Sequence, residues 1–242
     1  MNISKIANLK YFYKHTKSVS KILSFITFFL FIAGIFWGLY IAPKDYLQGD
    51  SYRIIYVHVP AAWLSLQVYI IMAVTGFIAL VWKIKIMEII SIQSASIGAY
   101  FTLIALVTGM IWGKPTWGTY WVWDARLTSE LILLFLYIGI IVIYSSFTDK
   151  RQGAKIAALL AIVGLINIPI IHYSVEWWNT LHQGPTVTKF EKPSAHITML
   201  MPLLYMLLVF NLYFVTVLIK RVRLGIFQRE KNTKWMENYL ND

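Results

Sequence analysis

The run Ile89–Gly113, with the sequence IISIQSASIGAYFTLIALVTGMIWG, carries no charge and continues directly into KPTWGTYWVWDAR, residues 114–126. A helix needs about 20 apolar residues to cross the hydrocarbon core of a bilayer. The run lacks the alternation of apolar and polar side chains that marks a barrel strand. It therefore predicts a membrane-spanning helix that ends in an unusually aromatic segment.

Similar runs recur along the whole chain. The composition, 58% hydrophobic and 14% charged over 242 residues, is typical of a polytopic membrane protein. We predict an all-α integral membrane protein with one six-helix membrane domain over residues 1–242. The first run is too long for a cleavable signal peptide, so we expect it to be retained. The predicted spans are residues 22–42, 60–82, 89–113, 129–148, 156–175 and 196–219.

Lysine and arginine gather on one side of this topology. The basic tails 1–21 and 220–242 share a side with the loops 83–88 and 149–155. That side carries sixteen Lys and Arg residues against five Asp and Glu residues, and so the whole net charge of +11. The pattern predicts that both termini are cytoplasmic. It indicates topology and attraction to anionic lipid rather than nucleic-acid binding.

The opposite, outer loops hold the unusual chemistry. They carry the aromatic segment 112–126, and the cytoplasmic loops contain no Gly-rich phosphate-binding loop. The chain has no cysteine, which excludes thiolate metal ligands and covalent haem attachment through Cys-x-x-Cys-His. Ligation would have to use histidine, carboxylate or methionine.

His58 stands two residues before Pro60, where we expect an extended lead-in to the second span. Such a rigid position suits a ligand, but an interfacial histidine that merely caps the helix remains an equal alternative. His182 follows Trp178 by four residues, so the two share one face if the fifth helix continues outward. Taken alone, His182 is also compatible with an incidental position at an aromatic helix end.

The other histidines are weaker candidates. His172 lies after Pro169, near the outer end of the fifth span, where packing or a hydrogen bond explains it as well as ligation does. His196 opens the sixth span, and His15 lies in the basic N-terminal tail.

Two outer histidines beside several tryptophans suit haem, whose iron takes axial nitrogen ligands and whose ring stacks on aromatic side chains. Bare zinc or copper would need further ligands but no aromatic wall. Lys114, Arg53 and Arg126 are candidates to bind the propionates. Pairing of Arg126 with Asp124 or Glu130 is an equally open alternative.

Three motifs resemble those of a known family. WGTYWVWDARLTSEL, residues 117–131, resembles the tryptophan-rich WWD signature of a haem-handling superfamily. YVHVPAAW, residues 56–63, and YSVEWWNTLHQG, residues 173–184, resemble the flanking motifs of the haem exporter protein C family, which acts in cytochrome c maturation. The resemblance covers nearly the whole chain. Tyr120 stands where many superfamily members have tryptophan, and its aromatic face predicts little functional change.

The resemblance implies that haem b is held as cargo at the periplasmic surface of the bacterial inner membrane. It implies axial ligation of the haem iron by His58 and His182. The other residues that it places at the haem site are Trp117, Tyr120, Trp121, Trp123, Asp124, Arg126, Trp177 and Trp178.

The resemblance also implies partners. The haem would pass to a periplasmic haem chaperone, maturation protein E, beside ATP-binding cassette subunits A and B and the small membrane protein D. No catalytic residue is predicted, although holding haem and chaperone together would promote their covalent joining. Two alternatives stay open: a haem-transporting subunit of the cassette complex, and a quinol-linked membrane oxidoreductase.

Overall fold

The computed structural model describes residues 8–182, 184 and 195–241. Within these residues the regular elements are helical, apart from an isolated β-bridge between Asp45 and Gly49. The α-helices are α2 (Leu9–Phe36), α3 (Ile55–Trp82), α4 (Lys85–Trp117), α5 (Ala125–Ser146), α6 (Lys150–Val163), α7 (Asn167–Trp177), α8 (Ile197–Glu230) and α9 (Lys234–Asn241). A π-helical turn, η1 (Trp37–Ile41), continues α2, and the 3₁₀ turns η2 (Asp50–Ile54) and η3 (Gly164–Ile166) precede α3 and α7.

In the part of the chain that the structure describes, six continuous helical segments are long and apolar enough to cross a membrane, which confirms the predicted fold class. They are Leu9–Ile41, Asp50–Trp82, Lys85–Trp117, Ala125–Ser146, Lys150–Trp177 and Ile197–Glu230. The helices extend past the charge-free runs, because charged residues outside the hydrocarbon continue the same backbone hydrogen bonding. Residues 1–7 of the predicted basic N-terminal tail, and Asp242 of the C-terminal one, lie outside the described residues.

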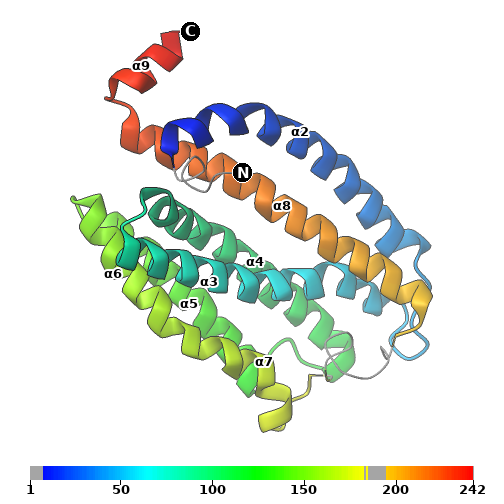
Figure 1. Cartoon of the computed structure of the whole chain (residues 1–242). Helices are drawn as coiled ribbons and strands as arrows, with labels where there is room; N and C mark the ends of the chain where they lie inside the picture. Colours follow the sequence, from blue (N-terminus) through cyan, green and yellow to red (C-terminus); the bar gives the residue numbers. More distant parts are fainter. Residues whose placement is uncertain (1–7, 183, 185–194, 242) are drawn as a thin grey trace.

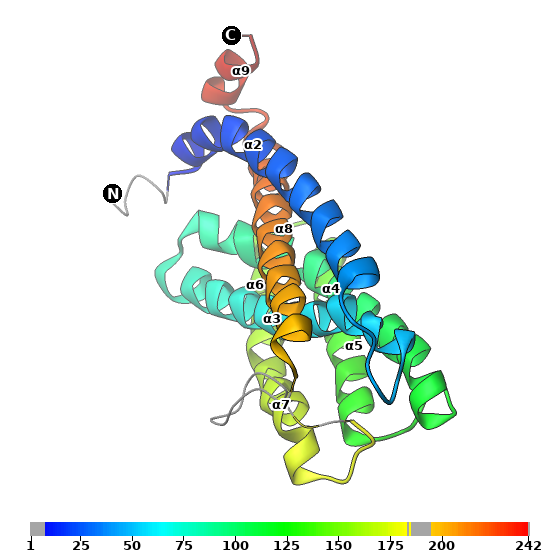
Figure 2. The same ribbon diagram turned by 90° about the vertical axis from the view of Figure 1, so that its right-hand side faces the viewer.

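The central pair of the bundle is formed by α3 and α4. The antiparallel helices α2 and α8 lie on one side of this pair, and α5, α6 and α7 lie on the other (Figures 1 and 2). Hydrogen bonds between side chains join α8 to the central pair and to α2. Gln67 Nε2 of α3 donates to Asn211 Oδ1 of α8 over 2.8 Å, and the hydroxyls of Thr27 and Thr216 join α2 to α8 over 3.1 Å.

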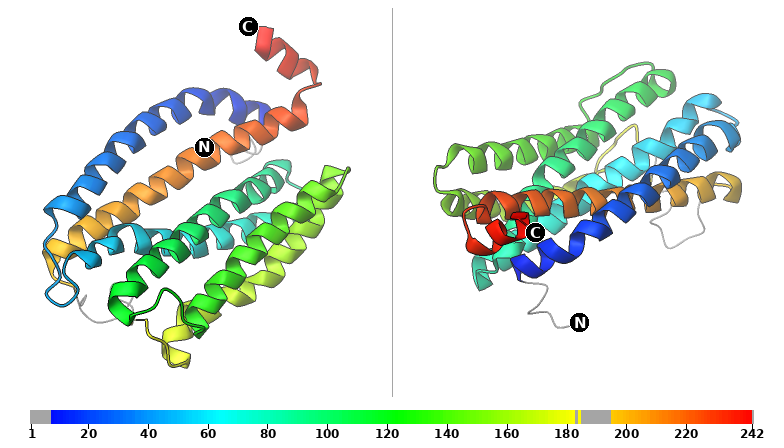
Figure 3. Two further views of the ribbon diagram at one scale, coloured as in Figure 1. Left: turned by 180° about the vertical axis from the view of Figure 1, so that it is seen from behind. Right: turned by 90° about the horizontal axis from the view of Figure 1, so that it is seen from above.

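The segments that connect the helices lie at two opposite ends of the bundle. The segments 42–49, 118–124 and 178–182 lie together at what we call the loop end, whereas α9 and the start of α2 lie at the opposite, terminal end (Figures 1 and 3). The short turns between α3 and α4 and between α5 and α6 are also at the terminal end. The predicted aromatic and histidine-bearing segments therefore share one end of the molecule.

Close packing around buried tyrosines fixes the helices α3, α4 and α5 against one another. The side chain of Tyr137 in α5 is fully buried and lies against Gly98 of α4, where an added Cβ would be 2.1 Å from Tyr137 Cζ. Tyr137 Oη donates to the carbonyl of Ser65 in α3 over 2.8 Å. Ser65 Oγ in turn donates to Glu130 Oε1 of α5 over 2.7 Å, so these polar groups are paired inside the bundle.

Candidate functional site

The loop between α4 and α5 is anchored at both of its ends. Gly118 ends α4 in the left-handed conformation, with φ of 79°, and its N–H donates to the carbonyl of Lys114 over 3.1 Å. Glycine adopts this conformation without steric cost, so the helix ends there. At the other end, Asp124 Oδ1 accepts a hydrogen bond from the N–H of Leu127 over 2.8 Å and caps α5. The aromatic side chains between these caps are thus carried on a short, fixed loop.

These aromatic side chains form an open apolar surface at the loop end. Trp123 is 76% exposed and Tyr120 is 55% exposed. Trp121 packs edge-to-face on Trp123, with 5.3 Å between ring centroids. Its buried Nε1–H has no hydrogen-bond partner among the described residues. Large exposed rings of this kind are typical of surfaces that contact a ligand or a partner.

His58 lies inside α3, so the predicted extended lead-in was wrong. The 3₁₀ turn η2 leads directly into α3 at Ile55, and the helix continues through Pro60. Pro60 is inside the helix, past its first turn, so its missing N–H removes the hydrogen bond that the carbonyl of Tyr56 would accept. The helix therefore begins before the proline rather than at it, and it holds the His58 backbone rigidly.

The ring of His58 rests on α4. Its Nδ1 lies 3.0 Å from Thr108 Oγ1, and Thr108 Oγ1 lies 2.6 Å from the carbonyl of Ile104, to which it donates. With its proton committed to that carbonyl, the Thr108 hydroxyl accepts from His58 Nδ1–H, which leaves Nε2 with a free lone pair. Trp112 packs edge-to-face on the imidazole at 5.6 Å between centroids. The absence of a side chain on Gly109 leaves room for the ring, since a Cβ there would be 3.1 Å from His58 Cε1.

His182 lies on a non-helical segment. Helix α7 ends at Trp177, and Trp178 is extended, with φ of −134° and ψ of 157°. The helical continuation that would have put Trp178 and His182 on one face does not occur. Instead the His182 ring packs edge-to-face on Trp117, at 4.8 Å between centroids.

Asp124 faces the same imidazole. His182 Nδ1 lies 3.5 Å from Asp124 Oδ2, which is longer than a good hydrogen bond, and neither atom has another partner among the described residues. The side chain of Asp124 is only 6% exposed. Burial is the main cause that lowers the pKa of His182; the nearby Arg126 lowers it further, and Asp124 partly opposes the change. The imidazole of His182 therefore stays neutral at pH values where an ordinary histidine is already protonated. A metal ligand must be neutral in this way.

The two histidines approach the end of α4 from different elements. His58 contacts Trp112 and His182 contacts Trp117, and both tryptophans lie at the C-terminal end of α4. Among the described residues, no hydrogen-bond partner of either Nε2 is found. The structure therefore presents two imidazole Nε2 atoms without a described hydrogen-bond partner, on rings that rest against tryptophans at the end of α4.

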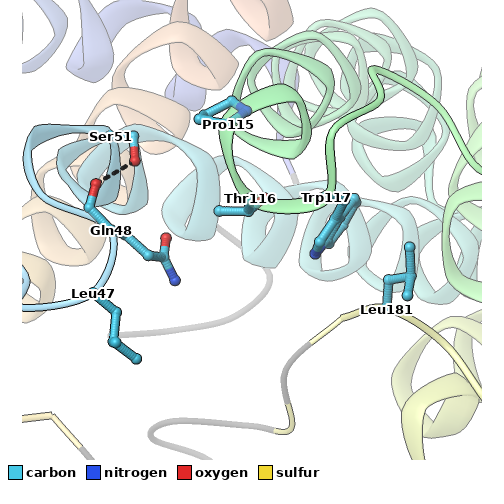
Figure 4. Close-up of a pocket in the computed structure, with 7 residues that line it drawn as sticks. All are labelled: Leu47, Gln48, Ser51, Pro115, Thr116, Trp117 and Leu181. Carbon is cyan, nitrogen blue, oxygen red and sulfur yellow. Dashed lines mark hydrogen bonds between the residues drawn. The ribbon is translucent and has the colours of Figure 1, made fainter.

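A cavity of about 350 Å³ opens beside this pair of contacts. Figure 4 shows Leu47 and Gln48 on one side, the end of α4 above, and Trp117 and Leu181 on the other side. Its size falls within the range of small-molecule sites. It lies between the segments 42–49 and 178–182, at the end of α4.

The model of the family described as Heme exporter protein C matches residues 2–237.

The chain belongs to the haem exporter protein C family.

Individual relatives agree with this assignment. The chain is 49% identical to the Heme exporter protein C of Haemophilus influenzae over 225 residues, 93% of this chain and 92% of the relative. It is 51% identical to the Heme exporter protein C of Escherichia coli K12 over 207 residues, 86% and 83% of the two chains. A Marchantia polymorpha protein named "Putative cytochrome c biosynthesis ccmC-like mitochondrial protein" is 49% identical over 184 residues, 76% and 78% of the two chains.

The three cations that were candidates to bind the haem propionates in this haem exporter family member have different surroundings. Arg53 is bonded to Asp50, at 3.0 Å, and to the carbonyl of Leu39, so it joins η2 to the end of α2. Lys114 donates to the carbonyl of Gly118 over 3.0 Å and lies over the Tyr120 ring at 5.3 Å. Arg126 has no ion pair with a described carboxylate, so its predicted pairing with Asp124 or Glu130 is not seen in that part of the chain.

The remaining candidate residues lie on the end of α7, just after it, and at the start of α8, all near the loop end (Figure 1). Trp177 and Trp178 pack edge-to-face at 5.7 Å, and Trp177 stacks on Tyr173 at 5.2 Å. His172 contacts Tyr173 on the exposed side of α7. His196 caps α8 by accepting from the N–H of Thr198 over 3.4 Å.

Sequence reasoning missed three residues that shape the site. Thr108 and Gly109 seat His58, and Gln48 Oε1 accepts from Trp112 Nε1–H over 2.7 Å. The signal for Thr108 was available, because it precedes Trp112 by four residues and so shares its helical face. Gln48 carried no such signal, since it comes from a loop distant in sequence.

The residues present fit haem, the ligand that the family name indicates. Imidazole nitrogens are a donor type that haem iron binds, and the exposed aromatic rings offer an apolar surface of the kind that suits the macrocycle. Among the described residues there is no group of three or more His, Asp and Glu side chains that would hold a bare metal ion. Arg126 supplies a cation for a propionate.

Proposed function

We propose that this protein binds haem b at the loop end and delivers it to a periplasmic haem chaperone, maturation protein E, for c-type cytochrome biogenesis. The observation that carries the proposal is the placement of two imidazoles, whose Nε2 atoms have no hydrogen-bond partner among the described residues, against Trp112 and Trp117 at the end of α4. Membership of the haem exporter protein C family supports it.

The proposed location follows from charge. The excess of Lys and Arg at the terminal end supports a cytoplasmic position for that end and a periplasmic position for the loop end in a bacterial inner membrane. The protein then works beside the cassette subunits A and B and the small membrane protein D. Its own residues make no covalent bond; they hold the cargo where the chaperone reaches it.

Each group at the loop end has a distinct part in holding haem. His58 and His182 bind the iron, and Trp117, Tyr120, Trp121 and Trp123 cover the macrocycle. Arg126 meets a propionate, while Trp177 and Trp178 border the site. Covering roughly 300 Å² of apolar area at about 25 cal/mol per Å² supplies several kcal/mol before ordering costs. The exposed edge of the aromatic loop is where the chaperone would gain access to the haem.

Asp124 acts by positioning His182. Its Oδ1 is fixed by the N–H of Leu127, so its Oδ2 is held toward His182 Nδ1. A carboxylate there favours the tautomer with the proton on Nδ1 and leaves Nε2 for iron. The carboxylate thus fixes the ring without itself touching the iron.

The variant Asp124→Asn is expected to weaken haem binding by about tenfold or more, the usual effect of losing such an orienting partner. Asparagine keeps the helix cap but turns an NH₂ group toward His182, which favours the tautomer whose Nε2 is blocked. Haem titration followed by absorption spectroscopy measures the loss. Asp149→Asn is the matched control, because Asp149 caps α6 at the terminal end in the same way, through the N–H of Arg151. Equal affinity and spectrum in wild type and Asp124→Asn would show that Asp124 has no orienting role.

Delivery is tested by mixing the haem-loaded, detergent-purified protein with the purified soluble domain of maturation protein E. We expect haem to move to the chaperone and to become covalently attached, as seen by haem staining after denaturing electrophoresis. Trp121→Ala/Trp123→Ala should slow this transfer, because the haem is no longer held in one orientation. Free haem that reacts with the chaperone just as fast as the loaded protein does would contradict the delivery function.

A further inference from the structure

A second cavity, of about 140 Å³, lies between α4 and α8, away from the loop end. Its walls are mainly apolar and aromatic, with Phe101 at its base and Tyr100 and Tyr213 at its margins. Tyr100 is 67% exposed and Tyr213 is 45% exposed, so the cavity opens onto the outer surface of the bundle. Since both helices are membrane-spanning segments, that surface faces lipid.

Two polar side chains interrupt this apolar wall. Ser96 Oγ and Arg221 Nε are buried, and neither has a hydrogen-bond partner among the described residues. Both residues line the cavity, one from each helix. A buried donor without a partner costs about 1–3 kcal/mol, and more when the group is charged. Ser96 Oγ and Arg221 Nε, both without a partner, therefore indicate that a polar ligand binds in this cavity.

The other arginines near the end of α8 are already paired. Arg223 donates to the carbonyl of Tyr13 and to Thr16, and Arg229 forms an ion pair with Glu88 at 2.8 Å. Within the described residues, Arg221 forms no ion pair. Its charge is thus available in the cavity, next to the end of the charge-free run 196–219.

The occupant must combine an anionic group with an apolar body. Arginine binds phosphate through paired N–H donors, and a serine hydroxyl adds one more donor. The cavity has less than half the volume of the one at the loop end, which favours a hydrocarbon chain over a tetrapyrrole. Basic pockets between membrane helices on the cytoplasmic side are typical sites for acidic lipid headgroups.

We propose that the groove between α4 and α8 binds one anionic phospholipid. Its phosphate is bound by Arg221 and Ser96, and one acyl chain lies in the groove between Tyr100 and Tyr213. This site is independent of the haem site and does not require the proposed haem function.

Native mass spectrometry of the full-length, detergent-purified protein tests the site. Phosphatidylglycerol or phosphatidylcholine is added, and the retained lipid is counted. We expect wild type to keep one phosphatidylglycerol in preference to phosphatidylcholine. Arg221→Gln should lower that retention by about tenfold, the effect of losing a charge-assisted contact. Val217→Trp, which fills the groove and leaves every charge in place, should lower it as well.

Lys220→Gln is the matched control, because it removes the same charge from the neighbouring exposed residue. It should retain phosphatidylglycerol as wild type does. Equal losses in Lys220→Gln and Arg221→Gln would mean that only general attraction to the basic surface operates, and would overturn the site. Retention that Val217→Trp leaves unchanged would also overturn it, as would displacement of the lipid by haem.

Discussion

Replacing both His58 and His182 by alanine is expected to reduce the haem bound by the purified protein at least about tenfold, because both axial ligands are lost and only apolar contact remains. Each single variant should retain part of the haem with an altered spectrum, since one imidazole still binds. The two rings rest on different tryptophans and have different Nδ1 partners. We therefore expect the two single variants to have distinguishable spectra.

The measurement is an absorption spectrum, with the haem content normalised to protein and haem supplied in excess. His172→Ala is the control, because His172 is an exposed histidine near the loop end that contacts Tyr173 rather than the loop between α4 and α5. It should leave haem content and spectrum unchanged. A double variant that binds as much haem as wild type, with the same spectrum, would rule out axial ligation by His58 and His182.

The variant Gly98→Ala is expected to lower the melting temperature by about 5 °C or more, because overpacking of a close-packed interior costs roughly 1–3 kcal/mol. The new methyl carbon would lie 2.1 Å from Tyr137 Cζ and 2.2 Å from its hydroxyl oxygen. Tyr137 cannot move away cheaply, since its side chain is fully buried and donates to the carbonyl of Ser65. Thermal unfolding in detergent, followed by circular dichroism, measures the effect.

Gly139→Ala is the matched control on α5. A Cβ at Gly139 meets only Leu160 Cδ2, at an ordinary 3.5 Å, so this variant should be neutral or slightly stabilising. Gly98→Ala combined with Tyr137→Leu should recover part of the lost stability, since the smaller side chain relieves the overlap. Equal melting temperatures for Gly98→Ala and wild type would show that α4 and α5 separate easily at this contact.

The sequence was sufficient to predict the six-helix membrane fold, because each helix carries a charge-free run long enough to cross the bilayer. It was also sufficient to single out the WWD segment and the two flanking histidines as candidates. Both predictions depend only on residues that are close together in the sequence: the composition of each apolar run and the length of each motif. The resemblance to the haem exporter protein C family was confirmed by a family match over residues 2–237.

The surroundings of each histidine could not be predicted. Because proline is common in the first turn of a helix, Pro60 suggested that the helix starts there and that His58 precedes it. The helix starts earlier, because the 3₁₀ turn η2 leads into it at Ile55. The pairing of His182 with Asp124 depends on where α7 ends and how the following segment returns to α5. Such contacts join residues distant in sequence, and periodicity within one helix says nothing about them.

The packing of α2 has a consequence for how the protein is made. This first helix packs mainly on α8, the last of the membrane-spanning helices. During synthesis α2 therefore enters the membrane without its main partner and waits until the five following membrane-spanning segments have been translated. Because this contact joins segments distant in sequence, a chain that stops before α8 leaves α2 unpaired in the lipid.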